Sequence, residues 1–171
     1  TLGDTVHETI VARARPGQLD ALLALLGRPQ TAGARTNLKT ALTLAAERVG
    51  RRGLVVLASD LLDFEQNALE PLTRLRSLGH DVIVFHFLHP HEVDFPFGER
   101  TRFVDPETLE SMDTDPEAVG AAYRERVRAY IVSCRQRCTS AGARYVLART
   151  DTPVQESIAQ ALSFRTQRSW A

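Results

Sequence analysis

The sequence predicts an α/β fold with a mostly parallel sheet, and two kinds of segment support this expectation. Three short apolar runs, residues 54–58, 82–88 and 143–148, have the length and composition of buried strands. Longer segments with apolar residues at helical spacing separate these runs. Strands that alternate with helices are joined by right-handed crossovers, so we expect a doubly wound, Rossmann-like sheet.

The beginning of the chain predicts one strand and two helices. Residues 6–12 alternate between apolar and polar side chains, which is typical of a short, half-exposed strand. Pro16 opens a helix with leucines on one face, which ends near Gly27. Residues 31–36, rich in Thr, Gly and Ala, lead into a second helix with an apolar stripe over residues 38–49.

The middle of the chain predicts two strands with a helix between them. The continuous apolar run 54–58 favours a fully buried strand. Residues 66–78 predict a helix with Pro71 in its first turn and Gly79 as its cap. The second strand, over residues 82–88, runs into a loop rich in His, Pro and Phe.

The last third predicts a hairpin, two helices and the third buried strand. Residues 102–104 and 109–112 are expected to pair around a turn that contains Asp-Pro-Glu. Asp115 and Pro116 predict the start of a long helix that runs to about Ser140. The final helix is expected to begin within residues 152–155, just after the third strand.

Composition excludes several classes of function. The 171 residues are 43% hydrophobic and 25% charged, which suits one ordered domain. Basic and acidic residues balance at 21 each, which argues against nucleic-acid binding and against anionic membranes. No stretch reaches the roughly 20 apolar residues of a membrane span. Cys134 and Cys138 lie four residues apart in a helical pattern, so we expect no disulfide and a cytoplasmic location.

Candidate functional residues follow the expected strand ends, where ligands bind in doubly wound sheets. Asp60 ends the first run, and its carboxylate suits either a ligand role or hydrogen bonds to loop amides. Thr36 precedes a helix, where its hydroxyl suits either a cap or a ligand. Imidazoles and carboxylates gather after the second run, a set that suits either zinc or a solvated polar loop: His86, His89, His91, Glu92 and Asp94.

Two stretches of the sequence stand out together: residues 34–38, Ala-Arg-Thr-Asn-Leu, and residues 54–63, which run from Leu54 to Asp63. These stretches resemble a von Willebrand factor A-type domain of the bacterial family called domain of unknown function fifty-eight. Residues 79–82, 121–126 and 151–153 fit the same family in the same order, so the resemblance covers essentially the whole chain.

The resemblance implies a three-layer sandwich with a metal-ion-dependent adhesion site built from three loops. Thr36 matches the second loop and Asp60 matches the third loop of that site, which holds Mg²⁺ or Mn²⁺. The first loop of the family carries an Asp-x-Ser-x-Ser motif, and this sequence does not contain one. We therefore expect an N-terminally truncated single domain over residues 1–171, with an incomplete site that binds no metal by itself.

The resemblance also implies a function. Members are protein-interaction modules rather than enzymes, a MoxR-type AAA+ ATPase is the implied partner, and many members carry an N-terminal membrane anchor. The alternative is a small hydrolase or phosphotransfer enzyme that uses Asp60 and the loop histidines, although no phosphate-binding glycine loop supports it. Loss of a central strand would bare the edge of residues 54–58. We expect either a homodimer across that edge or residues 6–12 to cover it.

Overall fold

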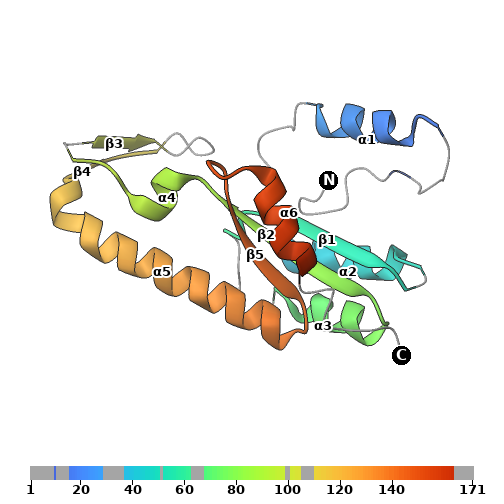
Figure 1. Ribbon diagram of the computed structural model, residues 1–171. Helices are drawn as coiled ribbons and strands as arrows, with labels where there is room; N and C mark the ends of the chain where they lie inside the picture. Colours follow the sequence, from blue (N-terminus) through green and yellow to red (C-terminus); the bar gives the residue numbers. More distant parts are fainter. Residues whose placement is uncertain are drawn as a thin grey trace.

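The sheet of the computed structural model has three parallel strands in the order β1-β2-β5 (Figure 1). They are β1 (Leu54–Ser59), β2 (Asp81–Leu88) and β5 (Arg144–Arg149). The strands pair with Ser59 opposite His86 and with His86 opposite Leu147. The expected α/β class with a mostly parallel sheet is therefore confirmed. The structure describes residues 10, 16–28, 37–50, 52–62, 68–98, 101–104 and 110–163.

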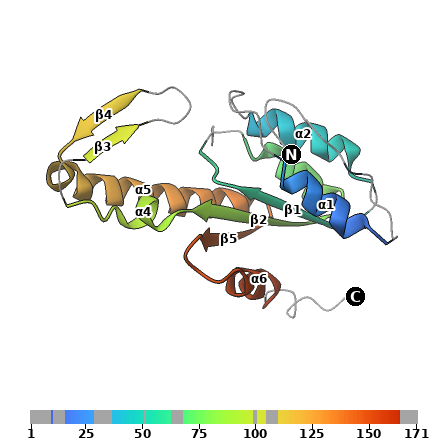
Figure 2. The same cartoon turned by 90° about the horizontal axis from the view of Figure 1, so that it is seen from above.

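Helices cover both faces of this sheet (Figure 2). One face packs against α2 (Leu38–Arg48), α3 (Glu70–Ser77) and α5 (Pro116–Ser140). The main core lies in this layer and buries side chains of all three helices, among them Leu42, Leu72 and Cys138. The other face packs against α6 (Val154–Ser163), where Ala161 meets Ile83 and Val146.

The ends of the helices follow from residues that the sequence marks. Asn37 caps α2 by accepting the Thr40 N–H at 2.9 Å. Asp115 caps α5 by accepting the Glu117 N–H at 3.1 Å, and Pro116 starts the helix, as expected. Gly79 follows α3 with φ of 88°, a left-handed conformation that glycine adopts without steric cost.

The expectation of a fully buried first strand is wrong. Leu57 of β1 is 4% exposed, whereas Leu54 and Val56 are 52% and 51% exposed. Alternate side chains of a strand point to opposite faces, so Leu57 and the half-buried Val55 face the core under α2 and α3. Leu54 and Val56 point to the other face, where the described core around α6 involves β2 and β5.

The hairpin forms, but with a shifted second strand. β3 (Thr101–Val104) and β4 (Ser111–Thr114) are antiparallel, so the second strand begins two residues later than expected. This register pairs Phe103 directly with Met112 and lets Arg102 donate to the Ser111 hydroxyl at 2.9 Å. The register therefore depends on which residues pair across the two strands, and the local sequence does not specify that pairing.

A short helix, α4 (Pro90–Asp94), replaces part of the loop expected after β2. His89 caps it with its imidazole, and the Glu92 side chain accepts the His89 N–H at 2.6 Å. This reciprocal arrangement is a capping box with histidine in the first position. The sequence interpretation missed it because histidine is not among the usual capping residues.

The N-terminal part of the chain is described only in pieces. The helix expected after Pro16 is α1 (Gln18–Leu26), and four of its leucines, Leu19, Leu22, Leu23 and Leu26, are 44–66% exposed. Of the strand expected over residues 6–12, only Ile10 is described, and it is not in a strand. The helix expected over residues 66–78 begins at Glu70, and residues 63–67 lie outside the described part.

Candidate functional site

A tight turn after β1 places Asp60 at the carboxyl end of the sheet. Asp60 is exposed, and its Oδ1 accepts the Leu62 N–H at 3.3 Å. The Ser59 hydroxyl accepts the Leu61 N–H at 3.1 Å. Leu61 between them has φ of 55°, a left-handed conformation that is strained for a bulky residue. These contacts fix the backbone conformation at Asp60. The hydrogen bond from the Leu62 N–H corresponds to one of the two roles expected for Asp60, a carboxylate bonded to loop amides.

The same turn also contacts α5. The Tyr130 hydroxyl on α5 donates to the Leu61 carbonyl, and the Leu61 side chain is 1% exposed within the main core. Burial raises the pKa of Tyr130 well above its ordinary value, so the hydroxyl stays protonated and remains a donor. The turn is therefore held by both its backbone and its side chain.

His86 lies beneath Asp60, because it pairs with Ser59 across the sheet. Its side chain is fully buried, and its Nδ1 lies 2.7 Å from the Tyr145 hydroxyl. Its Nε2 has no hydrogen-bond partner among the described residues. Burial lowers the pKa of His86, although the backbone and carboxylate of Asp60 oppose this effect. The imidazole is thus an uncharged part of the core.

The remaining histidines and carboxylates of the expected cluster have separate structural roles. His89 Nδ1 accepts the His91 N–H at 3.2 Å, and Glu92 completes the capping box of α4. Asp94 pairs with Arg149 at 2.7 Å. Within the described ranges, no three metal-ligating side chains come together. Of these residues, His86 lies next to the Asp60 turn, because it pairs with Ser59.

Arg149 at the end of β5 links two loops, a contact that sequence reasoning missed. Its guanidinium donates to Asp94 after α4 and to Asp151 after β5, with Nη2 at 2.7 Å and 2.9 Å. The Arg149 side chain lowers the pKa of both carboxyls. Both carboxylates are thereby engaged within the chain. The only signal in the sequence was the Arg-x-Asp pair at the strand end.

Of the two residues expected to hold a metal, the structure describes only Asp60. Thr36 lies outside the described residues. Asp60 is described and offers one exposed carboxylate. A hard cation such as Mg²⁺ takes about six oxygen ligands in near-octahedral geometry. The donor set present around Asp60 in the described part therefore does not fit a metal site without further ligands.

Both cysteines are buried in the main core on α5. Cys134 and Cys138 are 0% exposed and form no disulfide. Burial raises the pKa of Cys134 and raises that of Cys138 to about 12. Protonated, enclosed thiols are unreactive, so these cysteines act as small core side chains.

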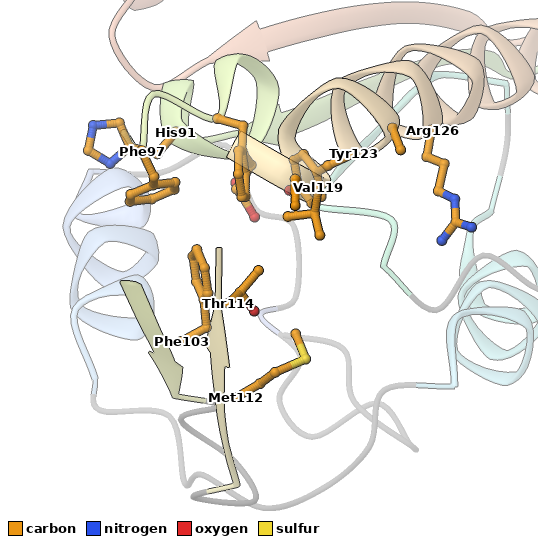
Figure 3. Close-up of a pocket in the computed structure, with 12 residues that line it drawn as sticks. His91, Phe97, Phe103, Met112, Thr114, Val119, Tyr123 and Arg126 are labelled. Carbon is orange, nitrogen blue, oxygen red and sulfur yellow. The ribbon is translucent and has the colours of Figure 1, made fainter. Parts of the chain in front are cut away.

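An apolar pocket of about 600 Å³ lies between α5 and the hairpin, away from Asp60 (Figure 3). Phe97, Phe103 and Met112 form one part of its lining, and Tyr123 and Arg126 of α5 form another. The sequence interpretation placed Phe97 in the loop rich in His, Pro and Phe and Phe103 in the hairpin, and it expected no cavity between them. Their signal was the cluster of aromatic residues around Pro96, although only the tertiary contact of the hairpin with α5 makes a cavity of it.

Comparison with known proteins identifies the family. The family model described as "Protein of unknown function DUF58" matches residues 2–132, which is most of the chain. The chain belongs to the DUF58 family. The strand-end turn with Asp60, its contact with Tyr130 and all the lining residues of the pocket therefore lie within the part that the family model matches.

A solved structure shows a similar fold for this DUF58 chain. A crystal structure of the conserved hypothetical protein BatB from Bacteroides thetaiotaomicron has a TM-score of 0.50 and 19% sequence identity. It covers 88% of the DUF58 chain and 70% of its own, and it supports the α/β architecture. A universal stress protein family member from Burkholderia pseudomallei, 17% identical over 67% and 74% of the chains, has a TM-score of 0.26. That score is too low to indicate a shared fold.

Two further findings are negative. A search of the curated proteins found no match to the DUF58 chain. Within the ranges that the structure describes, no helix combines the length and apolar character needed to cross a bilayer.

Proposed function

We propose that this chain is a non-enzymatic protein-interaction module of the von Willebrand factor A type that works with a MoxR-type AAA+ ATPase in the cytoplasm. The observation that carries the proposal is the exposed Asp60 carboxylate on an anchored turn at the carboxyl end of β1. Membership of the DUF58 family and the fold likeness to BatB support the domain type.

The strain in the turn supports a binding role. A non-glycine residue in the left-handed region costs on the order of 1–3 kcal/mol and persists only where the surroundings fix it. Here the buried Leu61 side chain and the Tyr130 hydrogen bond fix it. Strain of this kind is concentrated at functional sites, because it holds a group in place before its partner arrives. The group held in place by this turn is Asp60.

A metal ion would act at Asp60 only with added ligands. Thr36 is the proposed second ligand, and other oxygen donors are required for Mg²⁺ or Mn²⁺. When bound, such an ion supplies a coordination position for a carboxylate of the partner. With Asp60 as the one described donor, we expect the chain by itself to bind neither ion tightly.

The arrangement of the candidate acid and base groups favours binding over catalysis. A general base needs to reach a substrate, typically in a concave pocket. His86 is buried with Nδ1 on Tyr145, and neither His86 nor Asp60 lines the described pocket. Of the loop histidines in the hydrolase alternative, His91 lines the pocket, but Asp60, the proposed nucleophile, does not line it.

The proposal predicts that Asp60→Asn weakens binding to a purified MoxR-type ATPase from the same genome by about tenfold or more. Loss of one charged contact at an interface has this size of effect. Binding is measured by calorimetry in the presence of Mg²⁺ and again with a chelator. Asp81→Asn is the matched control, because Asp81 is an exposed carboxylate at the opposite end of the sheet. Equal affinities of Asp60→Asn and wild type would overturn the proposal.

The open face of β1 gives a second prediction. Among the described residues β1 is an edge strand of the three-stranded sheet, with Leu54 and Val56 exposed, and edge strands tend to pair with another chain. We propose a homodimer across this strand. Light scattering should give a dimer mass for the wild type and for the control Val132→Lys, which is exposed on α5. Val56→Lys should give a monomer mass, and a monomeric wild type would contradict the dimer.

A further inference from the structure

We propose that the pocket between α5 and the hairpin binds a single anionic amphiphile, a small molecule with an apolar body and one carboxylate. The pocket is about 600 Å³, within the range of small-molecule sites. The site is separate from the function proposed for Asp60, which does not line it.

The aromatic side of the pocket is a preformed cluster around Phe95. The Phe95 ring centroid lies 4.5 Å from that of Tyr123, 5.1 Å from Phe97 and 5.8 Å from Phe103. Phe95 is 6% exposed and packs over Gly120 of α5, where an added Cβ would lie 3.4 Å from the Phe95 ring. Rings that fix one another in this way form a rigid apolar surface, which costs a ligand little ordering entropy.

The other walls leave apolar surface open to solvent. On α5, Val119 is 39% exposed, and Ala118 and Ala122 are also exposed. On the hairpin, Met112 is 65% exposed across the pocket from this helix (Figure 3). Thioether side chains adapt to irregular ligands, and small helix residues leave room for a chain. The pocket therefore offers apolar contacts to the body of the ligand on both sides.

Arg126 supplies a positive charge at one end of the pocket. Figure 3 shows Arg126 beyond Tyr123, at the end of the pocket away from His91 and Phe97. Arg126 is exposed and has no ion-pair partner in the described part of the chain. Glu92, the acidic lining residue, already accepts the His89 N–H at 2.6 Å as the cap of α4. Because no described residue pairs with it, Arg126 favours an anionic group on the ligand, and a guanidinium suits a carboxylate.

The test is calorimetric titration of monomeric decanoate, below its micelle concentration, into the full chain. The expected result is saturable binding of one decanoate per chain, with decanol bound at least about tenfold more weakly. Arg126→Gln should weaken decanoate binding about tenfold, whereas Arg128→Gln, on the same helix but outside the lining, should not. Ala122→Phe should fill the pocket and abolish binding, whereas Ala129→Phe should not, since Ala129 is exposed outside the lining.

Several outcomes would overturn the proposal. They are absence of saturable binding by the wild type, equal affinity for decanol, and unchanged binding by Arg126→Gln. Sedimentation with phosphatidylglycerol vesicles distinguishes a free ligand from a membrane: no sedimentation supports the proposal, and sedimentation that depends on Arg126 contradicts it. Because Arg126 and Ala122 are exposed, circular dichroism should show a native fold for their variants. None of these results depends on the ATPase measurement with Asp60→Asn.

Discussion

Leu72→Ala is expected to lower the free energy of unfolding by about 2–5 kcal/mol. Leu72 lies on α3, is 0% exposed and belongs to the core between the sheet, α2 and α5. Truncation removes apolar surface from this core and leaves a cavity, because close-packed neighbours relax only in part. Urea unfolding followed by circular dichroism measures the change.

Leu78→Ala is the matched control for this substitution. Leu78 follows the same helix and is 50% exposed, so the identical truncation opens no enclosed cavity. The loss there is expected to stay below about 1 kcal/mol. Similar losses in the free energy of unfolding at both positions would contradict the packing of α3 that buries Leu72 against the sheet.

The second large effect is a dependence of stability on pH that comes from His86. Burial lowers the pKa of His86 in the folded chain, whereas the unfolded chain has an ordinary histidine pKa of about 6.5. Below that value the unfolded state binds more protons than the folded state, so stability falls as the pH falls. The full contribution is present above about pH 6.5 and is lost toward the depressed pKa, with a slope of up to about 1.4 kcal/mol per pH unit.

His86→Phe should remove this slope, because phenylalanine cannot be protonated. The free energy of unfolding is measured in urea at intervals from pH 8 to pH 5. His91→Gln serves as the control and should retain the slope, since His86 is still present. Phenylalanine also leaves the Tyr145 hydroxyl without its 2.7 Å partner, so a uniform loss of stability at all pH values is expected as well. A slope equal to that of the wild type would show that His86 is not its source.

Much of the fold could be predicted from local sequence. The apolar run after Gly53 became β1, and Asp115 with Pro116 started α5 as expected. Gly79 ends α3 because a left-handed position after a helix suits glycine. These predictions were correct because the signals act within one element, through side-chain spacing, backbone conformation and hydrogen bonds to nearby residues.

The candidate site was predictable only in part. Asp60 was singled out because a carboxylate that follows a strand lies at the ligand-binding edge of such a sheet. His86 was assigned to the same cluster as His89, yet the structure buries His86 against Tyr145 and uses His89 as a cap. The alternation of side chains along β2 decides to which face of the sheet His86 points, and the neighbouring strand decides which side chain it contacts.

The sequence by itself determined that this is an α/β protein with helices where the periodicity places them and Asp60 at a strand end. Only the tertiary structure decided that Val56 is exposed, that Leu61 is strained over Tyr130, and that Phe95 gathers the rings of a pocket. The physical reason is the range of the interactions. Spacing and caps act over a few residues, whereas burial and pockets depend on packing between segments far apart in the chain.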